Sequence, residues 1–104
     1  MKKILLITLF RNRSVLFRKA VQSVLVQTLD RNKFDYLLFN NDSEDNSEQL
    51  AQVYTRKYSN IHLYKSKTNL GQQGAYNKIL FEIIPKNFKN HSVSIIIIDF
   101  AIFI

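Results

Sequence analysis

Polar side chains that suit an anionic ligand follow the apolar segments of this sequence. Arg11 and Arg13 come directly after the first apolar run, and Asp99 comes at the end of the last one. A polar stretch at 40–47 follows the second run and reads Asn-Asn-Asp-Ser-Glu-Asp-Asn-Ser. Asparagine offers both an amide donor and a carbonyl acceptor, and guanidinium groups suit phosphate oxygens. These residue types predict hydrogen bonding to a polar, negatively charged ligand, although Arg13 is equally well explained as a solvated residue at a helix start.

Apolar runs alternate with segments of helical spacing along the chain. Continuous apolar or β-branched runs between polar residues are typical of strands buried in a parallel sheet. Apolar residues that recur every three or four positions are typical of helices packed on such a sheet. Strands are expected at 3–9, 34–39, 61–64 and 92–98. Helices are expected at 14–28, 47–58 and 71–84, with Ser14 as the first N-cap and Pro85 closing the last helix.

This alternation predicts an α/β fold with a mainly parallel sheet and helices on both faces. We expect residues 1–104 to form a single domain, because 104 residues suffice for one core and 46% of them are hydrophobic. Ligands of such sheets bind beyond the carboxyl ends of the strands. The loops that begin at Phe10, Asn40 and Lys65, with the residues after Asp99, should therefore share one rim.

The composition favours an anionic partner without naming it. Fifteen Lys and Arg against eight Asp and Glu give a formal charge of +7, which suits nucleotides, nucleic acid or an acidic membrane surface. The basic residues are scattered, as on a solvated surface, and no nucleic-acid module is recognisable. The chain has no Cys, which excludes thiolate zinc sites and fits a reducing compartment. We expect a cytoplasmic protein, with peripheral membrane contact suggested by the charge.

Several other classes of protein are disfavoured by missing patterns. The apolar run at 4–10 is followed by Arg11 and lacks a cleavage site, so it is interpreted as a strand and not a signal peptide. The run at 95–104 is about half as long as a membrane-spanning helix requires. Neither a Gly-x-Gly-x-x-Gly fingerprint nor a Gly-Lys-Ser/Thr phosphate loop occurs, which argues against dehydrogenases and nucleotide triphosphatases.

Four segments in sequence order resemble family 2 glycosyltransferases. The turn at 12–14, Asn-Arg-Ser, leads into a helix that ends in Gln27-Thr28, as in that family. The stretch 40–47 stands where the family has Asp-Asp-Gly-Ser-x-Asp-Gly-Thr, with Asn in place of both leading Asp residues. The segment 69–77 resembles the family's Asn-x-Gly-x-x-x-Ala-Arg-Asn through Asn69, Gly71, Ala75 and Asn77, with Tyr76 in place of Arg. The last strand leads into Asp99 at the position of an Asp-x-Asp metal motif, with Ala101 as the third residue.

The resemblance implies part of a GT-A fold that binds a nucleotide-diphosphate sugar and transfers the sugar to a saccharide or lipid-linked acceptor. It implies Mg²⁺ or Mn²⁺ as cofactor, held through Asp99 and weakened by Ala101. No catalytic residue can be named, because the family's base lies beyond the Asp-x-Asp position. Glu44, Asp45 and Glu48 are not nominated as catalysts, because residues 45–47 are better explained as loop and helix-cap residues. The implied donor-nucleotide contacts are Phe10, Asn12, Asn40, Asn41, Asn69, Gly71 and Asn77.

The apolar stretch from Ile95 to Ile104, around Asp99, lacks a closing polar turn, so a shortened or frameshifted glycosyltransferase reading frame is expected. Two alternatives stay open at this point. One is a non-catalytic remnant or donor-binding module, which would bind nucleotide without transferring sugar. The other is an unrelated basic α/β domain that binds nucleic acid, whose affinity would fall steeply with salt.

Overall fold

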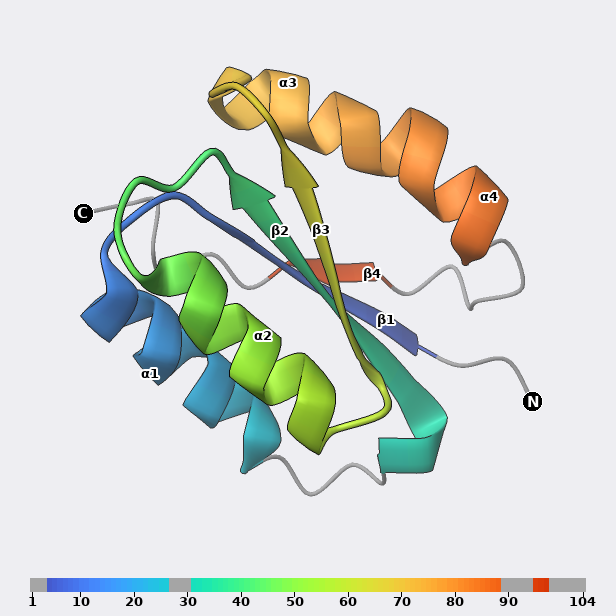
Figure 1. Ribbon diagram of the computed structural model, residues 1–104. Coiled ribbons are helices and arrows are strands. Elements are labelled where there is room, and N and C mark those ends of the chain that lie inside the picture. Colours follow the sequence, from blue (N-terminus) through green and yellow to red (C-terminus); the bar gives the residue numbers. More distant parts are fainter. Residues whose placement is uncertain (1–3, 27–30, 89–94, 98–104) are drawn as a thin grey trace.

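The computed structural model describes residues 4–26, 31–88 and 95–97 (Figure 1). In this part of the chain four parallel strands form one sheet in the order β3-β2-β1-β4. The strands are β1 (Ile4–Phe10), β2 (Phe34–Asn41), β3 (Ile61–Ser66) and β4 (Ile95–Ile97). The helices are α1 (Ser14–Leu25), α2 (Ser47–Lys57), α3 (Gly71–Lys78) and α4 (Ile84–Asn87), with a 3-10 turn, η1 (Arg31–Lys33), and a π turn, η2 (Ile79–Ile83). The expected mainly parallel α/β fold is confirmed.

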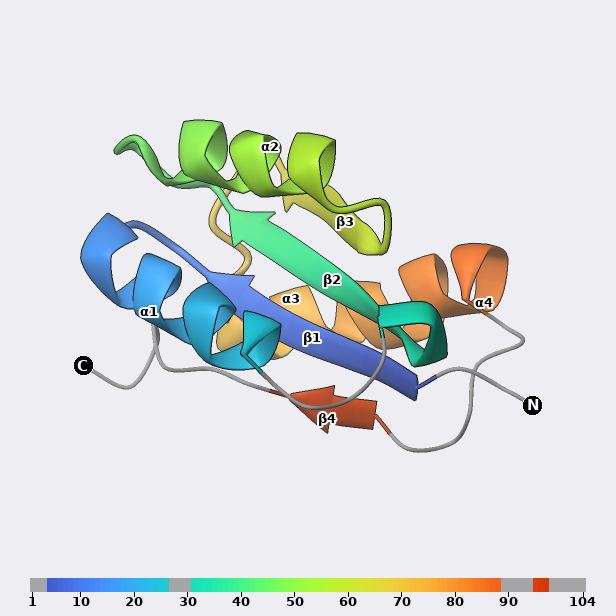
Figure 2. The same cartoon turned by 90° about the horizontal axis from the view of Figure 1, so that it is seen from below.

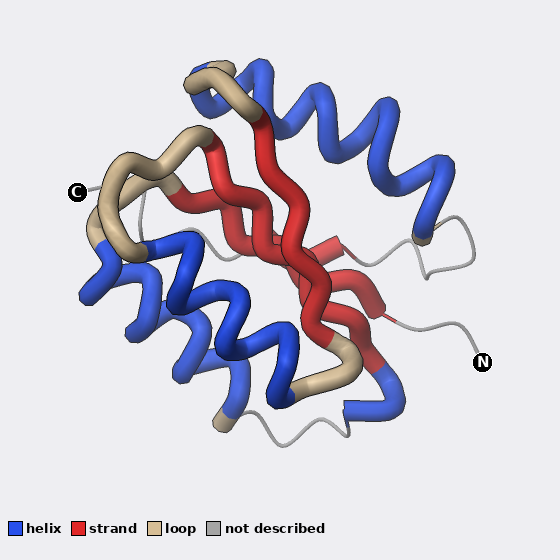
Figure 3. Tube along the Cα trace, viewed as in Figure 1, coloured by secondary structure: helices blue, strands red, loops and turns tan. Residues whose placement is uncertain are grey.

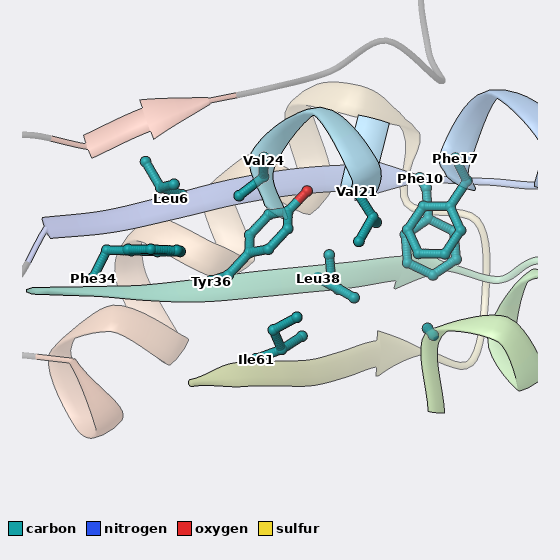
Figure 4. Packing of buried hydrophobic residues seen from close by; sticks show 10 residues of the cluster. Leu6, Phe10, Phe17, Val21, Val24, Phe34, Tyr36, Leu38 and Ile61 are labelled. Atoms are coloured by element: carbon teal, nitrogen blue, oxygen red, sulfur yellow. The ribbon is translucent and has the colours of Figure 1, made fainter. Parts of the chain in front are cut away.

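The helices cover both faces of the sheet. Figures 1 and 2 show α1 and α2 on one side and α3 with α4 on the other. Because successive strand residues point to opposite faces, β1 sends Leu6 and Phe10 toward α1, and Leu5, Ile7 and Leu9 toward α3 and η2. Figure 4 shows the first of these clusters. The continuous apolar strands are thereby explained, since both of their faces are buried.

The carboxyl ends of three strands meet at one edge of the sheet. β1 pairs with β2 so that Phe10 lies opposite Asn40, and β2 pairs with β3 so that Asn41 lies opposite Ser66. Figure 3 shows the loops that leave these strand ends gathered at the same side of the molecule. The loops after β1, β2 and β3 therefore share a rim, as the sequence predicted.

The second strand is longer than its apolar run predicted. Asn40 and Asn41 belong to β2 and are buried, with exposed fractions of 3% and 5%. Their polar side chains are tolerated there because both are hydrogen-bonded to neighbouring loops. The prediction that the polar loop begins at Asn40 was wrong, and the loop begins at Asp42.

The first helix begins differently from the prediction. Arg13, and not Ser14, occupies the N-cap position, and it makes no side-chain cap bond. Asn12 and Arg13 both have φ near +58°, in the left-handed region that asparagine tolerates better than most residues. The described helix ends at Leu25, and the expected end at Thr28 lies outside the described residues.

Pro85 does not end the third helical segment, contrary to the prediction. The segment continues through the π turn η2 into α4, where Pro85 lies in the first turn. A proline inside a regular helix lacks an N–H and collides with the carbonyl four residues earlier. A π turn, whose bonds span five residues, accommodates the ring at this point. None of the described helices has the length and apolar character needed to cross a membrane.

Candidate functional site

A pocket of about 330 Å³ opens at the shared rim of the strands. Its walls come from the loop after β1, from the end of β2 and from the turn between β3 and α3. None of its lining side chains is acidic. The lining residues are Arg11, Asn12, Arg13, Asn41, Asn69, Gly71 and Gln72.

Asn12 fastens the loop after β1 to the loop after β2. Its backbone N–H donates to Ser43 Oγ at 2.9 Å, and its Oδ1 accepts from the Glu44 N–H at 2.7 Å and the Asp45 N–H at 3.3 Å. The three bonds hold two loops that are about thirty residues apart in sequence. The oxygen of Asn12 is thus used within the protein, whereas its side-chain N–H₂ makes no hydrogen bond to the described part of the chain.

Asn41 joins β2 to the turn between β3 and α3. Its Nδ2 donates to Asn69 Oδ1 at 3.2 Å and to the Gly71 carbonyl at 3.3 Å. Its Oδ1 accepts from the Leu70 N–H at 2.9 Å and lies 3.2 Å from Ser66 Oγ. Asn41 therefore touches the pocket with a side chain that is almost fully hydrogen-bonded to protein.

Asn69 and Gly71 form the turn that begins α3. Asn69 Oδ1 accepts from the Gly71 N–H at 3.0 Å as well as from Asn41. Gly71 has a φ of +72°, a conformation that favours glycine because it has no Cβ. Asn69 is exposed, and its side-chain N–H₂ makes no hydrogen bond to other described residues, so it can donate to a ligand.

Two arginines give the pocket its positive charge. Arg11 contacts Glu44 with 3.6 Å between Nη2 and Oε1, but the Glu44 side chain is 78% exposed, so the pair is weak. The Nε of Arg11 is buried without a hydrogen-bond partner among the described residues. Arg13 is exposed at the mouth of the same pocket. The site therefore offers unused N–H donors and positive charge to an anion.

A second pocket of about 270 Å³ lies beside the loop after β2, and it contains Asn40. Asn40 donates to Glu48 Oε1 at 3.2 Å and accepts from the Ser43 N–H at 2.9 Å. Glu48 also pairs with Lys65 at 3.4 Å. The lining residues are Asn40, Asp42, Ser43, Glu48, Lys65, Ser66 and Lys67. Its charges are mixed, in contrast to those of the first pocket.

Asp45, in the loop after β2, has a structural partner. Asp45 Oδ1 accepts from the Ser47 N–H at 3.0 Å at the start of α2. Partial burial alone would raise the pKa of Asp45, but hydrogen bonds from Ser47 and nearby backbone N–H groups hold it below its ordinary value. Asp45 thus caps the loop and helix start, as the sequence predicted.

The structure brings Asn12, Asn41, Asn69 and Gly71 together at the first pocket. Gln72 also lines it and was missed, although its position at the start of α3, next to Gly71, was a signal for it.

Three of the predicted contacts lie elsewhere. Asn40 lies in the second pocket. Phe10 is fully buried, and its ring stacks on Phe17 with 3.9 Å between centroids, as Figure 4 shows. Asn77 is exposed on α3 and lines neither pocket.

The metal prediction concerns residues that are not described. Asp99 and Ala101 both lie outside the described residues. Within 4–26, 31–88 and 95–97 no group of three or more His, Asp or Glu side chains is placed to hold a metal ion. The first pocket presents amides and guanidiniums, which do not fit a divalent cation without added carboxylates or phosphates.

A parallel α/β sheet with an N–H-rich pocket beyond its strand ends is the arrangement of nucleotide-binding α/β domains. The family described as "Glycosyl transferase family 2" matches residues 5–83, and the chain belongs to this family. The resemblance inferred from the four segments is confirmed. The alternative of an unrelated nucleic-acid-binding domain was wrong.

One curated relative is the minor teichoic acid biosynthesis protein GgaB of Bacillus subtilis. It is 33% identical over 66 residues, which cover 64% of this chain and 7% of that protein. The matched region is therefore a small part of a much longer protein.

Two solved structures share the fold. One is the S. aureus protein TarS, residues 1–349, with a TM-score of 0.70 and 17% identity over 93% of this chain and 27% of that one. The other is the mannosyltransferase PcManGT of Pyrobaculum calidifontis in complex with GDP-Man and Mn²⁺, with a TM-score of 0.68 and 16% identity. That match covers 75% of this chain and 23% of the other. This chain spans about a quarter of the length of each structure.

Proposed function

We propose that this chain binds the nucleotide-diphosphate part of a sugar donor in its first pocket, as the donor-binding portion of a glycosyltransferase. The observation that carries the proposal is the set of N–H donors on the residues that line that pocket: the guanidinium groups of Arg11 and Arg13 and the side-chain amides of Asn12 and Asn69. Family membership supports the same activity, and the PcManGT structure contains GDP-Man.

The donor set suits a diphosphate better than a neutral sugar. Guanidinium groups bind phosphate oxygens through charge-assisted hydrogen bonds, which are about twice as strong as neutral ones. Amide N–H₂ groups can donate to phosphate oxygens or to the carbonyl groups of a base. The absence of carboxylates from the lining residues removes a source of repulsion toward the phosphates.

The acceptor and the metal are further parts of the proposal. We propose a saccharide or lipid-linked acceptor, supported by the teichoic acid relative. Mg²⁺ or Mn²⁺ would be held by Asp99 together with phosphates of the donor. The role proposed for the described pocket does not depend on the ion. We propose a cytoplasmic location, which the lack of Cys fits, and contact with an acidic membrane surface, which the formal charge of +7 favours.

Replacing the pocket arginines tests the diphosphate assignment. Arg11→Gln and Arg13→Gln should each weaken binding of uridine or thymidine diphosphate at least about tenfold, because each removes a hydrogen bond to a charged group. Calorimetric titration at moderate salt, with and without Mn²⁺, measures the loss. Arg56→Gln is the matched control, since Arg56 is exposed in the last turn of α2, outside the pocket lining. Equal affinities in all four proteins would contradict the assignment.

Binding and transfer are separate questions for this chain. A donor-binding module or remnant would bind the diphosphate with base selectivity and release no free nucleotide from the sugar donor in the presence of acceptors. A complete enzyme would release nucleoside diphosphate in step with glycosylated acceptor. The same purified chain used for titration answers both questions.

A further inference from the structure

We propose that Asn41 is a positioning residue, which fixes the side-chain amide of Asn69 so that its N–H₂ faces the pocket. The sequence predicted Asn41 and Asn69 alike as direct contacts of the donor nucleotide. This inference rests on the proposed function for its consequence in binding. The orientation of the two amides rests on their own contacts within the protein.

Both N–H donors of Asn41 are used within the protein, and the side chain is buried. An asparagine side chain can donate twice and accept twice. Nδ2 of Asn41 donates to Asn69 and Gly71, and Oδ1 accepts from the Leu70 N–H. The Ser66 hydroxyl lies 3.2 Å from the same Oδ1, but its one hydrogen is directed to the Thr68 carbonyl at 2.6 Å. With both donors and the Leu70 bond used within the protein and only 5% of the residue exposed, Asn41 holds the pocket wall.

Backbone groups determine which way both amides point. The Leu70 N–H can only donate, so the group that faces it at 2.9 Å must be the oxygen of Asn41. The Gly71 N–H likewise faces the oxygen of Asn69 at 3.0 Å. The nitrogen of Asn41 then meets that same oxygen at 3.2 Å. Two bonds on Asn69 Oδ1 leave its N–H₂ free to donate into the pocket.

A carboxylate at position 41 would reverse this arrangement. One oxygen of the new carboxylate would keep the bond from Leu70, but the other would face two acceptors, Asn69 Oδ1 and the Gly71 carbonyl. Rotating the Asn69 amide would relieve the first repulsion by turning its N–H₂ toward the carboxylate. The Gly71 N–H would then lose its acceptor, and the pocket would present an oxygen to the phosphates.

Three variants of the full chain separate positioning from ligand contact. Asn41→Asp should disturb the turn and weaken binding. Asn69→Asp keeps an acceptor for both the Asn41 N–H₂ and the Gly71 N–H but removes the N–H₂ that faces the ligand. Gln52→Glu makes the same amide-to-carboxylate change at an exposed site on α2 and serves as the charge control. The readouts are the Gly71 backbone amide resonance without ligand, the unfolding temperature and the affinity for uridine diphosphate.

In Asn41→Asp the Gly71 resonance should move upfield, as an amide does when it loses its acceptor, and both unfolding temperature and affinity should fall. Asn69→Asp should keep the Gly71 resonance and the unfolding temperature while affinity falls about tenfold, a loss typical of one charge-assisted bond. Gln52→Glu should change none of the three. An Asn41→Asp protein that loses affinity with an unshifted Gly71 resonance would overturn the proposal, because Asn41 would then touch the ligand directly.

A titration of the wild-type protein gives a second test, which holds even if the Asn41→Asp protein does not fold. Saturation with uridine diphosphate should shift the side-chain N–H₂ signals of Asn69 and leave those of Asn41 nearly unchanged. Larger shifts at Asn41 than at Asn69 would overturn the proposal. If the wild type does not bind the nucleotide, the proposed function fails, whereas the Gly71 resonance in Asn41→Asp still tests the orientation of the amides.

Discussion

At the scale of single residues, the pocket depends on a turn that only glycine enters without strain. Gly71 has a φ of +72°, and a Cβ built on it would meet nothing within 4 Å. The requirement for glycine is therefore conformational and not one of space. Gly74, three residues later, lies inside α3, where a Cβ would meet Leu70 Cβ at 3.2 Å.

Gly71→Ala should destabilise the fold by roughly 1–2 kcal/mol, the cost of a left-handed conformation with a side chain. Its affinity for nucleotide should fall too, because Gly71 positions Asn69 and Asn41. Gly74→Ala is the control. Replacing glycine by alanine in a helix interior stabilises the helix by about 1 kcal/mol, which offsets the cost of the shift that the partly exposed Leu70 must make. Urea unfolding of both variants measures the difference, and equal loss of stability in both would contradict this account of Gly71.

At the scale of elements, β1 and β2 are joined by a polar contact inside the apolar core. Thr8 Oγ1 and the Tyr36 hydroxyl lie 2.6 Å apart, and both residues are fully buried. Figure 4 shows the Tyr36 ring among Leu6, Val21, Val24 and Leu38. Burial raises the pKa of Tyr36 above its ordinary value of 10.0, although the hydrogen bond to Thr8 partly opposes the shift.

Tyr36→Phe should cost about 1–3 kcal/mol, because Thr8 Oγ1 is then buried without this partner. Tyr64→Phe, which removes a hydroxyl from a partly buried tyrosine on β3, should change stability by less than about 0.5 kcal/mol.

The raised pKa of Tyr36 makes the stability of the fold depend on pH. Because the tyrosine of the unfolded chain ionises at a lower pH than buried Tyr36, the folded state loses stability as pH rises above about 10. Thermal unfolding at neutral and alkaline pH should show a smaller alkaline loss in Tyr36→Phe than in the wild type.

The elements were predictable where the sequence pattern and the burial coincide. The runs at 4–10 and 34–39 are buried on both faces, and their continuous apolar sequence predicted strands. The apolar residues at helical spacing in α1 face the sheet, and this spacing predicted the helix. The ends of elements were not predictable in the same way. Asn40 and Asn41 continue β2 because partners distant in sequence satisfy their side chains, and the π turn before Pro85 leaves no signature in residue type.

The lining of the candidate pocket was predicted only in part. Strand order and spacing were enough to bring Asn12, Asn41 and Asn69 to one rim. Whether a given asparagine contacts the ligand or holds the turn depends on which backbone N–H it faces, and residue type and spacing do not determine this. Phe10 illustrates the same limit, since its side chain lies in the core against Phe17.

For the molecule as a whole, we propose that the rim pocket beyond β1, β2 and β3 receives the nucleotide diphosphate. The formal charge of +7 would attract any polyanion to much of the surface. The second pocket, with Lys65 and Lys67, lies at the same rim and is the nearest competing location. A test must therefore locate the ligand as well as detect it.

The most direct measurement is the map of backbone amide shifts during titration with uridine diphosphate, compared with inorganic pyrophosphate at the same ionic strength. We predict saturable shifts at residues 11–13 and 69–72 and small changes at Lys65 and Lys67. The shifts caused by uridine diphosphate should differ from those caused by pyrophosphate, which lacks the base. Shifts that follow the basic residues over the whole surface, or that centre on the second pocket, would contradict the proposal.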